Sequence, residues 1–249
     1  MGRLQGMVAI VTGSGQGLGL AMARALGEAG ARLVLVEIRE ERLANAAAQL
    51  RETGADVAAL AGDVRSRQVA DDAVALALAQ FGRLDILVNC AQWLAMPVPF
   101  IEQDAAHFAN MIDSGLYGTV NFMQAAYPAL KRQGGSIVNM GSGAGTGGNI
   151  GQAAYGAAKE AIRGLTRTVA KEWGADGIRI NTICPAAMSP SLIGWFKDKP
   201  EELAATLSLN ASGRFAEGTD IGSLAVFLAS PDCFLTGQTL HCDGGQVMP

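Results

Sequence analysis

The stretch TGSGQGLG, residues 12–19, decides the fold of this chain. It continues the apolar run MVAIVTG at 7–13, which has the composition of a buried strand, and leads into the helical run LAMARALGEAGA at 20–31. Its glycines let the backbone turn sharply and approach a bound group closely. Because a helix N-terminus favours negative charge, a strand, a glycine turn and a helix in this order predict a phosphate-binding loop.

Six further strand-like runs lie at residues 32–37, 56–62, 84–90, 135–140, 178–184 and 238–244. Helical patterns separate most of them, and no repeat or linker divides the chain. This alternation predicts an α/β fold of Rossmann type: a doubly wound parallel sheet of about seven strands with helices on both faces. We expect residues 1–249 to form a single domain for dinucleotide binding and catalysis.

Composition excludes several classes of function. The net charge is -4 and the basic residues are scattered, which argues against a nucleic-acid partner. No uninterrupted apolar run reaches the roughly 18 residues of a membrane span, and the N-terminal run leads into the glycine turn rather than a cleavage site, so we expect a soluble cytoplasmic protein. With four cysteines that form no CxxC motif and two histidines, no metal site is expected.

Glu37 ends the strand-like run RLVLVE eighteen residues after Gly19, where a carboxylate would meet the adenine-side ribose of a dinucleotide. A carboxylate accepts hydrogen bonds from both ribose hydroxyls and repels a 2′-phosphate, so NAD is predicted rather than NADP. Arg39 supports the alternative, since it could turn toward a phosphate, although IREERL at 38–43 also suits a charged helix start.

Tyr155 and Lys159 lie four positions apart in QAAYGAAKEA, residues 152–161, and therefore share one face of a helix. Lowering the pKa of a phenol from about 10 to about 7 requires roughly 4 kcal/mol of preferential stabilisation of the phenolate. One positive charge about 4 Å away supplies about that much at an effective dielectric near 20. The pair can therefore make Tyr155 a general acid/base near neutral pH.

A second Tyr-x-x-x-Lys pair, YPALK at 127–131, has the same spacing, and a serine lies thirteen residues before each tyrosine. Context separates the two sets. Ser142 follows the strand-like run GSIVNM and opens a glycine-rich stretch, whereas Ser114 lies inside a long helical pattern at residues 111–133. We therefore expect the set that contains Ser142 to be catalytic.

With these motifs the chain closely resembles the short-chain dehydrogenase/reductase family, essentially from end to end. The motifs are T-G-x-x-x-G-x-G at 12–19, Y-x-x-x-K at 155–159, DV at 63–64, NCAQ at 89–92 where the family usually has N-N-A-G, NTICPAAMSP at 181–190 and the C-terminal run at 213–245. The resemblance implies an NAD-dependent enzyme that interconverts a secondary alcohol and a ketone. It also implies a homotetramer, paired through the helical runs at 115–133 and 153–174.

Specific roles follow from the resemblance. Tyr155 would exchange the proton of the substrate oxygen, Lys159 would lower the pKa of Tyr155 and bind the nicotinamide ribose, and Ser142 would orient the substrate oxygen. Contacts with the cofactor are implied for Gly13, Gln16, Gly17, Leu18, Gly19, Glu37, Asp63, Val64, Asn89, Ala91, Tyr155, Lys159, Pro185, Ala186 and Met188.

Three positions depart from the family pattern. Gln92 and Ala186 replace glycines, and Gly115 stands where the family has an asparagine that helps to hold a water linked to the lysine. These departures motivate an alternative function, a redox-silent nucleotide-binding regulator or scaffold of the same fold. Because the backbone carbonyl of Gly115 could still hold the water, we expect Gly115→Asn to change turnover less than tenfold.

The segment at about 189–209 corresponds to the part that closes over substrate in this family. An apolar substrate pocket is predicted from Trp93, Met96, Ile193, Trp195 and Phe196. No arginine cluster favours a phosphate or a coenzyme A tail. We therefore expect an uncharged alicyclic or aromatic alcohol as the substrate.

Overall fold

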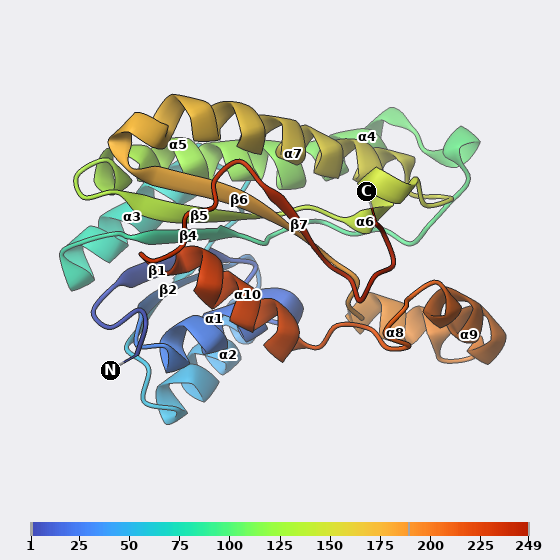
Figure 1. Cartoon of the computed structure of the whole chain (residues 1–249), viewed down its shortest axis with the longest axis horizontal. Helices are drawn as coiled ribbons and strands as arrows, with labels where there is room; N and C mark the ends of the chain where they lie inside the picture. Colours follow the sequence, from blue (N-terminus) through green and yellow to red (C-terminus); the bar gives the residue numbers. More distant parts are fainter. Residues whose placement is uncertain (1, 189, 249) are drawn as a thin grey trace.

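A computed structural model describes residues 2–188 and 190–248 and contains one seven-stranded sheet in which every strand pair is parallel (Figure 1). The strands are β1 (Val8–Thr12), β2 (Arg32–Glu37), β3 (Val57–Ala61), β4 (Ile86–Asn89), β5 (Gly135–Met140), β6 (Ile178–Pro185) and β7 (Thr239–Cys242). Their order across the sheet is β3-β2-β1-β4-β5-β6-β7. The predicted strands and the doubly wound α/β fold are confirmed.

Two hydrophobic cores lie on opposite faces of the sheet, each under three long helices (Figure 1). One face carries α1 (Gly17–Glu28), α2 (Glu40–Glu52) and α10 (Gly218–Ala229), and the other carries α3 (Arg67–Phe81), α5 (Gly118–Leu130) and α7 (Ala153–Trp173). Side chains alternate between the cores along a strand: Val11 of β1 faces the first core and Ile10 faces the second. Burial on both faces explains why the strands are continuously apolar.

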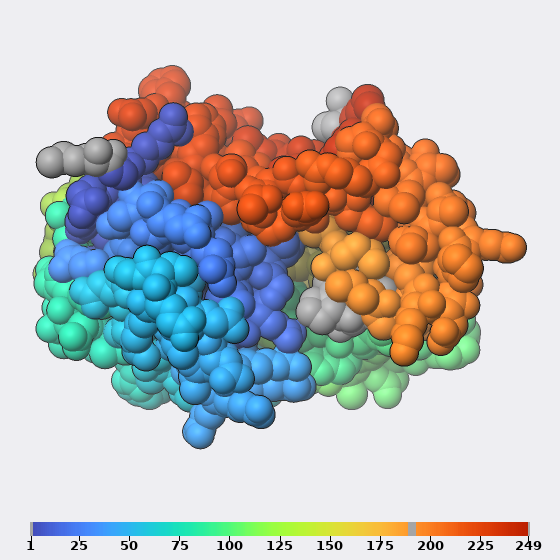
Figure 2. All heavy atoms as spheres, turned by 90° about the horizontal axis from the view of Figure 1, so that it is seen from below, coloured from blue at the N-terminus to red at the C-terminus, as the bar shows by residue number. Residues whose placement is uncertain are grey.

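The shorter helices follow the carboxyl ends of the strands or precede the long helices. They are α4 (Ala105–Ile112), α6 (Gly143–Gly147), α8 (Pro190–Phe196) and α9 (Pro200–Ser208), with 3₁₀ turns at Phe100–Glu102 and Gly174–Asp176. Strand order reverses between β1 and β4, the point at which ligands bind in open α/β sheets. A cleft of about 730 Å³ lies there, and in Figure 2 a hollow separates the blue N-terminal elements from the orange segment of α8 and α9.

The helix predicted over residues 111–133 is helical as far as Leu130 but contains one π-helical turn that the prediction lacks. Helix α4 ends at Ile112, one π-helical turn covers Asp113–Tyr117, and α5 begins at Gly118. The amide of Gly118 bonds to the carbonyl of Asp113, five residues back. A π-turn inserts an extra residue without ending the helix, and such turns are frequent at functional sites. Helical periodicity in the sequence cannot distinguish a helix with this π-turn from a regular α-helix.

The second Tyr-x-x-x-Lys pair has a structural role at the opposite end of the sheet from the cleft. The Tyr127 hydroxyl donates to Asp176 Oδ2 at 2.7 Å, and Lys131 Nζ lies 3.2 Å from that hydroxyl and 3.1 Å from Asp176 Oδ1. The ring of Tyr127 packs on Trp173, with centroids 4.6 Å apart. These contacts tie α5 to the end of α7.

Candidate functional site

The glycine turn after β1 exposes backbone that no side chain covers. Gly13 and Gly17 have positive φ angles of 64° and 56°, which other residues rarely adopt. A Cβ on Gly19 would overlap the carbonyl oxygen of Gly13, and a Cβ on Gly13 would lie 2.8 Å from Cα of Ala91. Helix α1 starts here with no side-chain cap from Gln16 and no acidic residue in its first turn. Its amide groups are therefore suited to a pyrophosphate.

Glu37 lies at the end of β2, where the sequence places it, and is 8% exposed. Its Oε2 accepts a hydrogen bond from the amide of Gly15 and its Oε1 from the amide of Arg39, each at 3.2 Å. The side chains of Arg39 and Arg42 line the same part of the cleft. An acid and two guanidinium groups thus share the region expected to hold the adenine ribose.

Asp63 and Val64 also line the cleft, after β3. A hydrogen bond from Arg65 lowers the pKa of Asp63, and the Val64 carbonyl accepts one from Asn121 Nδ2 at 3.1 Å. Pro185 and Ala186 after β6 line the cleft as well. Ala186 is held by its amide, which donates to the Cys242 carbonyl at 3.2 Å.

Two predicted cofactor residues after β4 differ in position. The amide of Ala91 donates to Thr12 Oγ1 at 3.1 Å, which joins the ends of β4 and β1 beside the cleft. Asn89 is buried and does not belong to the cleft lining. Its Nδ2 donates to Asn139 Oδ1 at 2.8 Å, so its side chain links β4 to β5.

Ser142, Tyr155 and Lys159 come together at the wall of the cleft. Ser142 caps α6, and its Oγ accepts a hydrogen bond from the Ala144 amide at 3.1 Å. Tyr155 stands in the first turn of α7, and Lys159 follows one turn later. The Lys159 Nζ donates to the Met140 carbonyl at 2.9 Å and lies 5.6 Å from the centre of the Tyr155 ring.

The electrostatics of this set differ from expectation. Burial raises the pKa of Tyr155 to about 12, against a smaller opposing effect of its hydrogen bond with Ser142. Burial also lowers the pKa of Lys159 to about 8. The Tyr155 pKa is therefore raised rather than lowered, because removing a phenolate from water costs more than the hydrogen bond with Ser142 returns. The lowering of this pKa by Lys159 stays a prediction.

Apolar residues line part of the cleft. Four of the five residues predicted for a substrate pocket belong to this lining: Trp93, Met96, Trp195 and Phe196. The fifth, Ile193, does not and is 56% exposed. A sequence window predicts that a segment contributes to a pocket but not which side of its helix faces inward.

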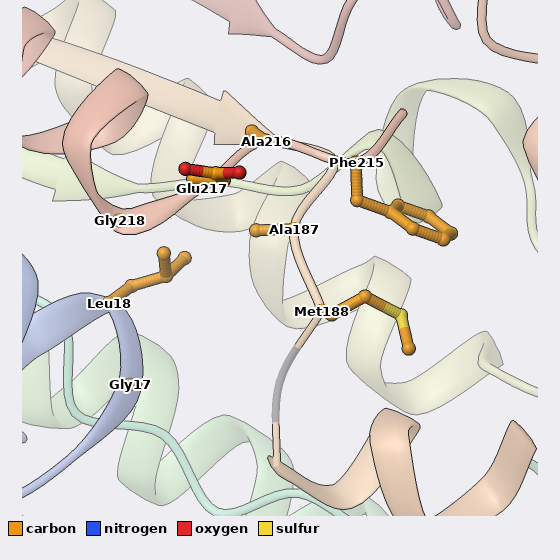
Figure 3. Close-up of a pocket in the computed structure, with 8 residues that line it drawn as sticks. All are labelled: Gly17, Leu18, Ala187, Met188, Phe215, Ala216, Glu217 and Gly218. Carbon is orange, nitrogen blue, oxygen red and sulfur yellow. The ribbon is translucent and has the colours of Figure 1, made fainter. Parts of the chain in front are cut away.

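A smaller cavity of about 370 Å³ adjoins the cleft (Figure 3). Leu18 of α1 faces Ala187 and Glu217, with the predicted cofactor residue Met188 farther along the segment after β6. The glycine turn and this segment therefore share one space beside the cleft.

Several residues that line the cleft have no counterpart in the sequence prediction: Cys90, Ser114, Asn149, Gln152, Thr206, Phe215 and Gln246. The NCAQ motif could have indicated Cys90, since it directly follows a strand. Ser114, expected inside a helix, lies in the π-turn, and its Oγ accepts a hydrogen bond from the Trp93 amide at 3.0 Å and donates to the Asn110 carbonyl at 2.6 Å. It fixes the loop after β4.

Within residues 2–188 and 190–248, no cluster of three or more His, Cys, Asp or Glu side chains could hold a metal ion. None of the helices in the same ranges combines the length and the apolarity needed to cross a membrane.

Comparisons with known proteins agree with the site. A family model described as "Enoyl-(Acyl carrier protein) reductase" matches residues 13–246. A 12alpha-hydroxysteroid dehydrogenase of Clostridium sp. (strain ATCC 29733 / VPI C48-50) is 42% identical, over 98% of each chain. A D-threitol dehydrogenase of Mycolicibacterium smegmatis is 39% identical, over 99% of this chain and 95% of the relative.

A solved structure, of an NAD+-bound xylitol dehydrogenase, superposes with a TM-score of 0.91 at 29% identity, over 97% of this chain and 99% of that one. The family model covers the glycines of the turn, strands β2 to β7 and the Ser142, Tyr155 and Lys159 set together. The chain belongs to the short-chain dehydrogenase/reductase family.

Proposed function

We propose that this protein is an NAD-dependent oxidoreductase that interconverts a secondary alcohol and a ketone, with Ser142, Tyr155 and Lys159 as its catalytic residues. One observation carries the proposal: a single cleft joins these three side chains to the glycine turn and to Glu37. A dinucleotide that lies along the cleft would bring its reactive ring to the substrate oxygen.

When bound, the nicotinamide ring supplies the hydride acceptor and, in its oxidised form, a positive charge. The chain supplies the proton chemistry. The phenol of Tyr155 would first release its own proton along the path that begins at Lys159, and its phenolate oxygen would then take the hydroxyl proton of the substrate. A positive charge beside that oxygen opposes the effect of burial on its pKa. Ser142 Oγ accepts a hydrogen bond from the Ala144 amide, and its hydroxyl proton, which is shared with Tyr155, would turn to the substrate oxygen.

Lys159 can serve the cofactor and the proton path at once. An ammonium group has three donors, and the Met140 carbonyl accepts one of them. The remaining two can reach the ribose hydroxyls and the phenol. Its pKa of about 8 keeps most of the group protonated at neutral pH.

The proposed substrate is an uncharged alicyclic or aromatic alcohol. Four apolar side chains line part of the cleft: Trp93, Met96, Trp195 and Phe196. The relative named for a hydroxysteroid supports a cyclic alcohol. We propose that α8 and α9 form a lid over this substrate, and we expect the protein in the cytoplasm.

To test the function, purified protein is mixed with NAD and each of a panel of secondary alcohols, and the absorbance of the reduced cofactor is followed. Turnover with uncharged cyclic alcohols is expected. Turnover of anionic substrates alone would contradict the substrate class. Bound NAD with no turnover across the panel would favour the redox-silent regulator.

Glu37 is expected to set the choice of cofactor. Glu37→Gln keeps the size and one acceptor oxygen of the side chain but removes the charge that repels a 2′-phosphate. We expect the NAD to NADP preference in kcat/KM to fall by ten- to thirtyfold, about 1.4 to 2 kcal/mol. Glu40→Gln, at the exposed start of α2, is the matched control and should leave the ratio unchanged. A wild type that uses NADP better than NAD would overturn the assignment.

A homotetramer is the second expectation for the purified protein. By family resemblance, α5 and α7 are the helices that pair between subunits, and the half-buried Ala161 of α7 permits close approach. Gly118, which the sequence also suggested, is buried against Val64 of the same chain. Multi-angle light scattering at micromolar concentration measures the mass. A monomer there would refute the assembly while leaving the chemistry untouched.

A further inference from the structure

Two departures from the family pattern, Gln92 and Gly115, meet in space. Gln92 lies in the loop after β4, and Gly115 lies in the π-turn between α4 and α5. A Cβ on Gly115 would overlap Oε1 of Gln92, with Cδ and Nε2 of Gln92 each 3.0 Å away. The carboxamide of Gln92 therefore occupies the space into which a side chain at position 115 would extend.

Hydrogen bonds from its nitrogen hold the carboxamide of Gln92 in place. Gln92 Nε2 donates to the carbonyls of Met111 and Trp93, each at 3.1 Å, and lies 3.3 Å from Ser114 Oγ. Two carbonyl acceptors fix which end of the amide is the nitrogen, because a flipped amide would set oxygen against oxygen. The oxygen consequently points away from these partners.

The oxygen is the unusual atom of this group. Gln92 Oε1 is buried and accepts no hydrogen bond from the described residues. A buried acceptor without a donor is costly, so native proteins rarely keep one unless a bound molecule completes it. Gln92, Tyr155 and Lys159 line the same cleft, and Lys159 has donors to spare beyond the Met140 carbonyl.

We propose that Gln92 is a positioning residue of the proton path: its Oε1 accepts a hydrogen bond from a water bound to Lys159, and position 115 is glycine to leave it room. This rests on the proposed function. The loop after β4 thus supplies the carboxamide that position 115 lacks. The expectation that Gly115→Asn is nearly silent is accordingly reversed, because the new side chain displaces Gln92 from three partners.

The titratable groups around this path come from several elements. Tyr155 and Lys159 face it from α7, Cys90 from the loop after β4 and Cys184 from β6, and Asp113 lies on the π-turn itself. Burial raises the pKa of Cys90 and of Cys184 to about 11. Neither thiol therefore titrates in the range from pH 6 to 10 used below.

The test compares Gln92→Ala, Gly115→Asn and the combination of the two, with kcat and KM measured from pH 6 to 10 and NAD affinity measured by calorimetry. Each single change should lower kcat at pH 7 at least tenfold and move the acid limb of the profile to higher pH, with KM and the Kd for NAD within threefold. The combination should return kcat to within threefold of wild type, because asparagine at 115 then fills the space of the lost carboxamide.

Gln133→Ala is the matched control. Its Nε2 bonds to the Leu84 carbonyl and to Asp85 Oδ1, far from the cleft, so the pH profile should not move. The inference is overturned if Gln92→Ala leaves the profile unchanged, or if the combination is no better than Gly115→Asn alone. Gln92→Met, which fills similar volume, replaces Gln92→Ala if that variant does not fold.

Thermal melting separates this inference from the proposed function. Gly115→Ala should lower the melting temperature in the presence of Gln92 and have less effect when combined with Gln92→Ala. Equal effects in both backgrounds would contradict the contact between the two positions, whatever the activity. A wild type that binds NAD but oxidises no alcohol, with the melting result as expected, would contradict the proposed function and leave only the contact.

Discussion

Tyr155→Phe is expected to reduce kcat by two to four orders of magnitude, the range that general acid/base groups contribute, while NAD affinity changes less than about twofold. The substitution removes the hydroxyl that exchanges the substrate proton and keeps the ring that packs in the first turn of α7. Single-turnover absorbance of reduced cofactor measures the first effect, and calorimetry with NAD measures the second.

Tyr127→Phe is the matched control, since the chain repeats the same Tyr-x-x-x-Lys spacing there. It loses the hydrogen bond to Asp176 and with it some stability, but its hydroxyl lies at the other end of the sheet. We expect unchanged kcat. Equal losses of turnover from the two phenylalanine variants would mean that the catalytic set is misassigned.

Lys159→Met is expected to do two opposite things: to abolish most turnover and to stabilise the cofactor-free protein at pH 7. Lys159 is 3% exposed, and burial lowers its pKa from 10.5 to about 8. That shift corresponds to a cost of about 3 kcal/mol in folding free energy while the group is charged. Methionine fills the same space without the charge. A gain of that order in the free energy of unfolding, measured with urea, would show that the lysine needed for catalysis lowers the stability of the fold.

The pH dependence fixes the sign of this effect. Below pH 8 the lysine is charged in both folded and unfolded states, so the full cost is present. Between pH 8 and 10.5 the unfolded chain still holds a proton that the folded protein has released, so wild-type stability rises and the gain from methionine fades. Unfolding curves at pH 7, 8, 9 and 10 test the trend.

Lys131→Met is the control for the stability effect. Lys131 is exposed and paired with Asp176, so its replacement should not stabilise the protein at any of these pH values. A Lys159→Met variant that is less stable than wild type at pH 7 would show that the bond to the Met140 carbonyl outweighs the burial of charge.

The sequence by itself determined the seven strands, their parallel sheet and the glycine turn, because these depend on local periodicity and on backbone freedom at single residues. It also determined that Glu37 ends β2 and that Tyr155 and Lys159 share a helix face, since residue spacing within one element is fixed by the geometry of that element.

Only the tertiary structure decided the rest, because it depends on which elements become neighbours. The structure contains a π-turn at Asp113–Tyr117, and the side chain of Asn89 is buried against Asn139 of the neighbouring strand. It also buried Tyr155, which raises the pKa of the phenol. Above all, it brought Gln92 against Gly115 across 23 positions of sequence, where one side chain fills the space that the other lacks. Neither residue alone carries that information, since steric complementarity exists only between surfaces that the fold has joined.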